Sequence, residues 1–82
     1  MAEVIMDRLL DLEAAATLAD MAEFPGRLHQ LTADRSGQFA LDLRHPYRLI
    51  IEPDHTPVPT ESGTILRNQV TRVEVVGIVD YH

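Results

Sequence analysis

"QFALDLRHPYRLIIE", residues 38–52, holds two runs of alternating side chains on either side of the short link "RHP" at 44–46. A side-chain period of two is typical of β-strands, and so short a link predicts an antiparallel hairpin. One set of side chains is expected to face the core: Phe39, Leu41, Leu43, Tyr47, Leu49 and Ile51. The opposite face would then carry the remaining residues of the two strands: Gln38, Ala40, Asp42, Arg48, Ile50 and Glu52.

The chain before this hairpin predicts two helical segments and one more short strand. Apolar residues at spacings of four, three and four define one helix face: Ile5, Leu9, Leu12 and Ala16. Two further residues widen that face: Met6 and Leu10. A second helical turn is expected around Leu18, Met21 and Phe24, and Pro25-Gly26 ends it. "RLHQLT" at 27–32 is a strand candidate, followed by the polar turn "ADRSG" at 33–37.

After the hairpin we expect a long exposed loop over 53–68 and a final strand over 69–79. The alternation of that strand slips at Val75-Val76, before Gly77, which indicates either a β-bulge or a strand buried on both faces. The order of elements predicts one α+β domain over residues 1–82. In it, an N-terminal helix and a short second helix pack on one face of a small antiparallel sheet of about four strands.

Composition excludes several classes of protein. The chain has no cysteine, so it can form neither a disulfide nor a thiolate metal site, which suits the cytoplasm. No stretch approaches the ~20 apolar residues of a membrane span. The net charge of −6 argues against a broad electrostatic grip on nucleic acid. The charge is uneven, because residues 1–24 hold six acids and one arginine.

Few side chains stand out as candidates for chemistry. None of the four histidines has a zinc-ligand spacing, and His45 and His55 are interpreted as solvated surface residues. His29 would be half-buried within its strand. Arg48, in the middle of a strand, needs a partner or an exposed concave face, and Glu52, four residues further along on the same face, is the simplest partner. Arg35 could hold a phosphate, although the residues around it are also typical of an ordinary turn without a ligand.

Taken together, four fragments resemble the toxins of type II toxin–antitoxin modules, in the HigB branch of the RelE/ParE superfamily. In order along the chain they are Arg27-Leu28-His29, Asp34-Arg35-Ser36-Gly37-Gln38, Tyr47-Arg48 and Asp80-Tyr81-His82. The resemblance covers about residues 18–82. It implies a RelE-like fold and a metal-independent endoribonuclease, an mRNA interferase that cuts messages in the ribosomal A site without a cofactor. It also implies a role in plasmid maintenance and neutralisation by a cognate antitoxin, of the helix-turn-helix type.

The resemblance also assigns roles to individual residues. It makes His29, Tyr81 and His82 acid–base candidates, since imidazole takes up and releases a proton near neutral pH. Arg48 would steady the scissile phosphate, and Asp80 would orient or tune its neighbours. The three residues of the chain end would face Arg48 and His29 across one concave surface: Asp80, Tyr81 and His82. Arg27 and Arg35 would contact the phosphates of the RNA. No metal ligand is implied, and the partners would be the antitoxin, the ribosome and mRNA, with no membrane.

Three departures from the family pattern keep other functions open. Thr32 stands where active relatives usually carry a lysine, the chain is acidic where relatives are basic, and it starts inside the helix that follows the usual first strand. Without that strand one sheet edge would be exposed, which favours a homodimer or capture of a partner strand. The alternatives are therefore an inactive module that binds an antitoxin or dimerises and, with less support, a gyrase-poisoning toxin of the ParE branch.

Overall fold

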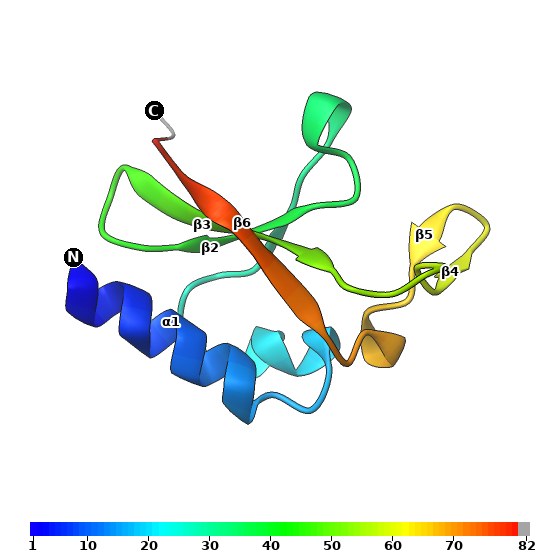
Figure 1. Ribbon diagram of the computed structural model, residues 1–82, viewed down its shortest axis with the longest axis horizontal. Helices are drawn as coiled ribbons and strands as arrows, with labels where there is room; N and C mark the ends of the chain where they lie inside the picture. The colour runs from blue at the N-terminus through cyan, green and yellow to red at the C-terminus, as the bar shows by residue number, and fades with distance from the viewer. Residues whose placement is uncertain (81–82) are drawn as a thin grey trace.

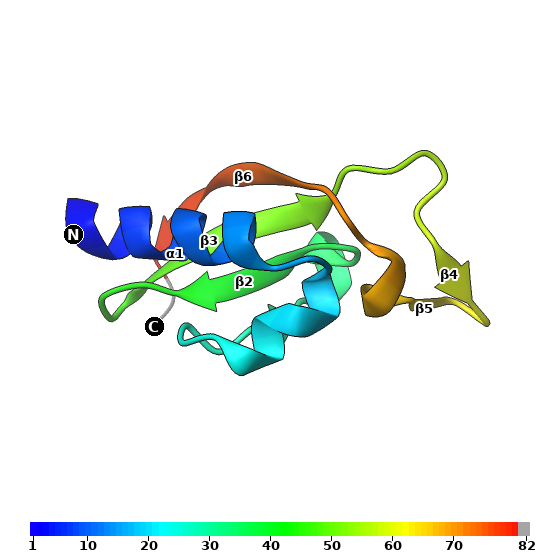
Figure 2. The same ribbon diagram turned by 90° about the horizontal axis from the view of Figure 1, so that it is seen from below.

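A computed structural model describes residues 1–80 as a helical layer packed on an antiparallel sheet (Figures 1 and 2). The helical layer contains α1 (Ala2–Ala14) and the 3₁₀ helix η1 (Leu18–Glu23). The sheet has the order β1-β2-β3-β6, with every neighbouring pair antiparallel. Its strands are β1 (His29–Gln30), β2 (Phe39–Asp42), β3 (Tyr47–Pro53) and β6 (Val73–Asp80). The expected α+β class, with two helices on a four-stranded sheet, is confirmed.

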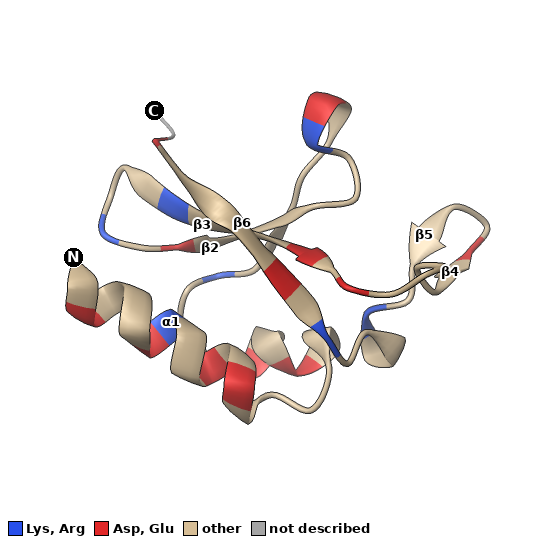
Figure 3. Ribbon diagram, in the orientation of Figure 1, with Lys and Arg blue, Asp and Glu red and all other residues tan. Residues whose placement is uncertain are grey.

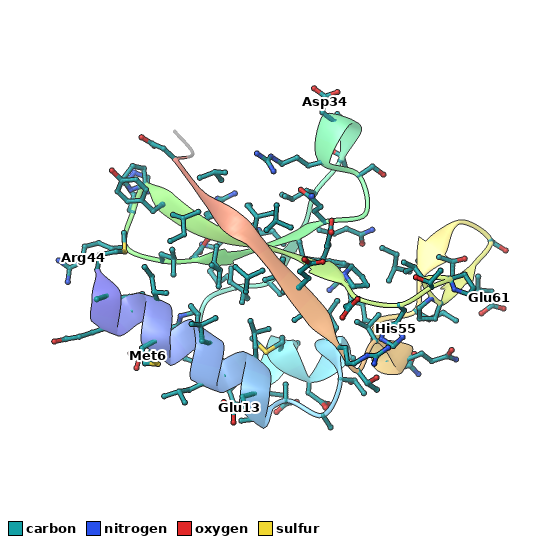
Figure 4. The ribbon with its side chains drawn as sticks, viewed as in Figure 1. Met6, Glu13, Asp34, Arg44, His55 and Glu61 are labelled. Carbon is teal, nitrogen blue, oxygen red and sulfur yellow. The ribbon has the colours of Figure 1, made fainter. Side chains whose placement is uncertain are left out.

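Helix α1 lies on the sheet through a narrower stripe than the sequence pattern predicts. Four of its residues pack against the core: Val4, Ile5, Leu9 and Leu12. Met6 and Leu10 are 56% and 54% exposed, so their inclusion in the buried face was wrong. Each lies one residue, and so about 100°, past a core residue and beyond the reach of the sheet. Figure 4 shows Met6 pointing away from the sheet. Because the helix ends at Ala14, Ala16 is also exposed, and Ala15 packs in its place.

The short helix η1 closes one end of the core. Its Leu18 and Met21 are almost fully buried, and the backbone N–H of Leu18 donates to the carbonyl of Val70 at 2.9 Å. At its start, the carboxylate of Asp20 accepts a hydrogen bond from the backbone N–H of Thr17, as a helix N-terminus requires. The chain then turns at Gly26, whose φ of +103° suits glycine. The second helix was therefore predicted correctly in place, although it is a 3₁₀ helix.

The β2–β3 hairpin forms the centre of the core in the predicted register. Its partners run from Phe39 opposite Ile51 to Asp42 opposite Arg48. The expected core face is buried except at Tyr47, which is 41% exposed at the start of β3. The opposite face is less polar than expected, because Ala40 and Ile50 are also completely buried. The 3₁₀ helix η2 (Ala33–Arg35) and its turn rise on that side, away from α1 (Figure 1).

Strand β6 contains the bulge that the slip in alternation indicated. Ile50 pairs with Gly77 and Ile51 with Val75, so Val76 is the extra residue. The other interpretation, burial on both faces, is wrong. Within the described chain β6 lies at an edge of the sheet, and Val75, Val76 and Ile78 are each nearly half exposed.

The segment 53–68 is more ordered than the predicted loop. It contains the ribbon of β4 (Thr60–Glu61) and β5 (Thr64–Ile65), joined by Ser62-Gly63 with φ of +52° and +80°. The 3₁₀ helix η3 (Arg67–Gln69) follows, so the last strand starts at Val73 instead of residue 69. The partly exposed His55 also has a structural role, because its Nε2 accepts hydrogen bonds from the backbone N–H groups of Thr71 and Arg72 at 3.1 and 3.3 Å. Figure 4 shows His55 beside the start of β6.

Candidate active site on the open face of the sheet

The sheet face turned away from α1 brings together residues from three strands. Directly opposed residues in antiparallel strands share a face, and the ladder aligns His29 with Ala40 and Asp42 with Arg48. Because Ala40 and Asp42 are two residues apart on β2, His29, Asp42 and Arg48 share one face. Together with Arg27, just before β1, they form what we call the Asp42 cluster.

The Asp42 carboxylate is the centre of this cluster. Its Oδ1 lies 3.4 Å from His29 Nε2 and 3.3 Å from Arg48 Nε, and its Oδ2 lies 3.9 Å from Arg27 Nε. The side chains of Asp42, His29 and Arg48 are about one-third exposed, whereas that of Arg27 is 80% exposed. The Arg27 pair is therefore largely screened by water and contributes little to stability. Arg27 nevertheless places a solvent-exposed cation at the rim of the cluster.

His29 is held differently from the two arginines. Its Nε2 atom is buried and makes no hydrogen bond within residues 1–80, although it lies at ion-pair distance from Asp42. The two observations agree if the contact is electrostatic and its angle does not suit a hydrogen bond. The nitrogen that faces Asp42 is thus withdrawn from solvent. Any proton exchange with a substrate would use the other ring nitrogen, Nδ1.

Arg48 does not take the partner that the sequence suggested. It contacts the carboxylate of Asp42, directly across the ladder, whereas Glu52 accepts a hydrogen bond from Gln38 at 3.2 Å. A directly opposed residue on the neighbouring strand lies closer than a residue four positions along the same strand. Arg35 joins the second group, since its Nη1 donates to Gln38 Oε1 at 3.1 Å. Arg35 is therefore tied to Gln38 and Glu52, a separate part of the same face.

Asp80 lies at the end of β6, and the ladder corrects its expected orientation. It pairs with Tyr47, while Val79 pairs with Arg48. By strand alternation the Asp80 side chain leaves the sheet on the side of Tyr47, so it does not share the face of Arg48 and His29. Asp80 still reaches the same end of the sheet as Arg48. The other two residues assigned to the chain end, Tyr81 and His82, lie outside the described residues.

Two hollows lie beside these elements. A polar pocket of about 180 Å³ adjoins the Asp42 cluster and is lined by Arg27, Asp42, Tyr47, Arg48 and residues of the hairpin turn. A more apolar groove of about 370 Å³ runs between the end of α1 and the start of β6, with Leu9, Leu12, Met21 and Val73 among its lining. The polar pocket lies at the hairpin turn, whereas the groove lies where α1 and η1 meet the start of β6. The first belongs to the candidate site, and the second is a separate surface.

Residues 1–80 contain neither a candidate metal site nor a helix that could span a membrane. Within this range no three histidine, cysteine, aspartate or glutamate side chains gather closely enough to hold a metal ion. None of the helices in this part of the chain has the length and apolarity needed to cross a membrane.

No family model matches the chain, and neither a curated protein nor a solved structure matches it.

Asp42 is the functional candidate that sequence reasoning missed. The signal was present, because a hairpin with Phe39 opposite Ile51 places Asp42 opposite Arg48. Counting the register across the "RHP" link would have found this pair. The contact with His29 was harder to find, because it depends on which edge of β2 the short strand β1 joins.

Proposed function

We propose that this chain is the toxin of a type II toxin–antitoxin module, a HigB-like endoribonuclease that cuts ribosome-bound messenger RNA in the cytoplasm. The observation that carries the proposal is the convergence of His29, Arg48 and Arg27 on one carboxylate, on a sheet face free of the helical layer. A proton-transfer group and two guanidinium groups thus face one place. Metal-free cleavage of a phosphodiester uses groups of these two kinds: one to transfer protons and the other to stabilise the charge on the phosphate.

The proposed reaction needs only the RNA and groups of this kind. A base removes the proton from a 2′-hydroxyl, whose oxygen attacks the adjacent phosphorus. The bond from phosphorus to the 5′-oxygen breaks, and an acid returns a proton to that oxygen. The products are a 2′,3′-cyclic phosphate and a 5′-hydroxyl. His29 and the residues at the chain end, Tyr81 and His82, are the proposed acid–base groups, while Arg48 stabilises the charge on the phosphorus oxygens.

The arginines at the hairpin end of the sheet support local RNA binding despite the net charge of −6. The acidic residues of 1–24 lie on α1 and η1 (Figure 3). Arg27 and Arg48 line the pocket of about 180 Å³ together with the exposed ring of Tyr47. An exposed aromatic ring beside arginines suits an unpaired base with its phosphate. Attraction for RNA is therefore local, and the acidic layer faces away.

The test is expression in a bacterium without an antitoxin, with a variant that lacks Tyr81 and His82 as the comparison. We expect the full chain to arrest growth and to cut translated messages, leaving 5′-hydroxyl ends. The shortened variant should fold, by circular dichroism, but cleave no message, because it lacks two proposed acid–base groups. A full chain that is folded and present in the cell but arrests no growth and cuts no message would contradict the proposal.

A second candidate, a binding module without catalysis, is favoured by the surface around β6. The apolar groove of about 370 Å³ adjoins this edge strand, on which Val75, Val76 and Ile78 are exposed. Such an edge can take up a strand from a cognate antitoxin. Tight binding of the product of a neighbouring gene, with no cleavage of message by the free chain, would support this function in place of the first.

A further inference from the structure

The Asp42 carboxylate has no role in the reaction proposed above, yet it contacts both residues that carry most of that proposal. It contacts His29 and Arg48 through the same oxygen, so that one atom bridges them. Asp42 is itself held in place, because its backbone N–H donates to the carbonyl of Gly26 at 2.6 Å. A fixed carboxylate between a histidine and an arginine can define the orientation of both.

For His29, the carboxylate selects which ring nitrogen carries the hydrogen. A carboxylate 3.4 Å from one ring nitrogen attracts a hydrogen on that nitrogen even where the angle does not complete a hydrogen bond. Here the buried Nε2 faces Asp42, so the lone pair is left on Nδ1. In catalytic triads an aspartate holds the histidine base in the correct tautomer through a hydrogen bond, whereas at His29 the effect is electrostatic.

For Arg48, the contact with Asp42 is made through Nε. This contact places the negative charge of Asp42 3.3 Å from the inner nitrogen of the guanidinium. Phosphate is recognised best by a guanidinium whose plane is already set. The same carboxylate therefore aligns the proposed base and the proposed phosphate ligand.

We infer that Asp42 is a positioning residue of this site, which sets the tautomer of His29 and the plane of Arg48. This inference rests on the proposed function. The competing view is that Asp42 occupies the phosphate site as a built-in competitor. The two views predict opposite effects on the rate of RNA cleavage when Asp42 is removed. Loss of a positioning group slows cleavage, whereas loss of a competitor speeds it.

The kinetic experiment compares wild type with Asp42→Ala on ribosomes that carry a defined message. We expect kcat to fall roughly 10²-fold, the scale of misplaced reacting groups. KM should not rise, because removal of a negative charge beside Arg48 favours approach of RNA. Asp42→Asn, which keeps one acceptor oxygen, should recover part of the rate. A kcat for Asp42→Ala that equals or exceeds wild type, or a loss that lies in KM, would overturn the inference.

The matched control is Glu61→Ala, which removes the same charge from an exposed position on β4 and should leave kcat unchanged. Glu61 lies in the β4–β5 ribbon at the far end of the molecule from the hairpin turn that carries Arg44 (Figure 4). Denaturant unfolding of each variant checks that it is folded. If Asp42→Ala does not fold, Asp42→Asn, which nearly preserves the shape, takes its place in every measurement with the same expected direction.

A spectroscopic measurement separates this inference from the proposed function. The ¹⁵N pattern of the His29 ring reports its tautomer, and exchange of the Arg48 Nε–H with water reports the contact with Asp42. We expect both to change in Asp42→Ala, and neither in Glu61→Ala. If the chain cleaves no RNA but both signals change, the proposed function fails and the positioning role stands. If neither signal changes, Asp42 positions nothing and the inference is wrong.

Discussion

At the scale of single residues, Gly26 connects the helical layer to the candidate site. Its carbonyl accepts the hydrogen bond of Asp42, and the next residue, Arg27, also has a positive φ of +46°. On its other side Gly26 lies against Arg8, since a Cβ at Gly26 would stand 2.8 Å from Arg8 Cδ. Arg8 is mostly buried and is held by Asp11 at 2.8 Å. Any larger residue at position 26 is therefore opposed twice, by the positive φ of the backbone and by the lack of space beside Arg8.

We predict that Gly26→Ala lowers the free energy of unfolding by about 1–3 kcal/mol. The added methyl group meets Arg8 and also forces a side chain into a backbone conformation that favours glycine. The control is Gly63→Ala, which has a φ of +80° but no atom within 4 Å of the new Cβ. Urea denaturation of both variants separates the cost of the backbone conformation, which both share, from the cost of the contact with Arg8, which only Gly26→Ala has. Equal losses at the two positions would show that the contact with Arg8 does not matter.

At the scale of elements, the bulge at Val76 sets the orientation of everything that follows it on β6. Before the bulge Val75 pairs with Ile51, and after it Gly77 pairs with Ile50. The extra residue is therefore accommodated without turning the strand over, so the two parts of β6 keep compatible faces. The end of the strand then brings Asp80 opposite Tyr47.

We predict that deletion of Val76 is tolerated better than deletion of Ile78. Without Val76 the pairs on either side become a regular ladder and no side chain changes face. Without Ile78 the residues after it move by one position, so Asp80 stands opposite Arg48 and Val79 opposite Leu49. The two deleted side chains are matched, at 45% and 47% exposed.

Thermal unfolding and backbone NMR contacts between β3 and β6 measure the outcome. We expect the Val76 deletion to cost less than about 2 kcal/mol, in the range of ordinary substitutions, and to keep the pairing of Asp80 with Tyr47. The Ile78 deletion should cost more and lose that pairing. Equal destabilisation by the two deletions would contradict the assignment of Val76 as the extra residue.

At the scale of the whole molecule, an apolar edge and a net charge of −6 act in opposite directions. Within residues 1–80 no strand pairs with the outer edge of β6, and the exposed Val76 lies on it. Such edges associate with one another unless charge prevents it. Two copies of this chain repel each other, and salt weakens that repulsion, since the Debye length falls from ~10 Å at 0.1 M to ~3 Å at 1 M.

We therefore expect self-association through β6 to increase with salt, as measured by sedimentation velocity over a range of protein concentrations. Val76→Lys should keep the chain monomeric at high salt, because the ammonium group lies on the associating edge. Met6→Lys is the matched control, since Met6 is equally apolar and exposed but lies on α1. If both variants lower association to the same extent, the effect is one of net charge and the edge is not the interface.

The sequence alone determined the elements whose pattern is local. The spacing of Ile5, Leu9 and Leu12 predicted α1, the alternation over 38–52 predicted the hairpin, and the slip before Gly77 indicated the bulge. These features depend on contacts between neighbours in the chain or across one tight turn. The ribbon at 60–65 was missed because each of its strands has only two residues, too few to show a period.

Only the tertiary structure decided which side chains meet. The sequence named His29, Arg48, Arg27 and Arg35 as candidates, but the sheet order brought the first three to Asp42 and left Arg35 with Gln38. His55 likewise became a structural residue because the chain folds back past it at Thr71 and Arg72. Such contacts join residues that are distant in sequence. They follow from strand register and packing, which the local pattern of side chains does not contain.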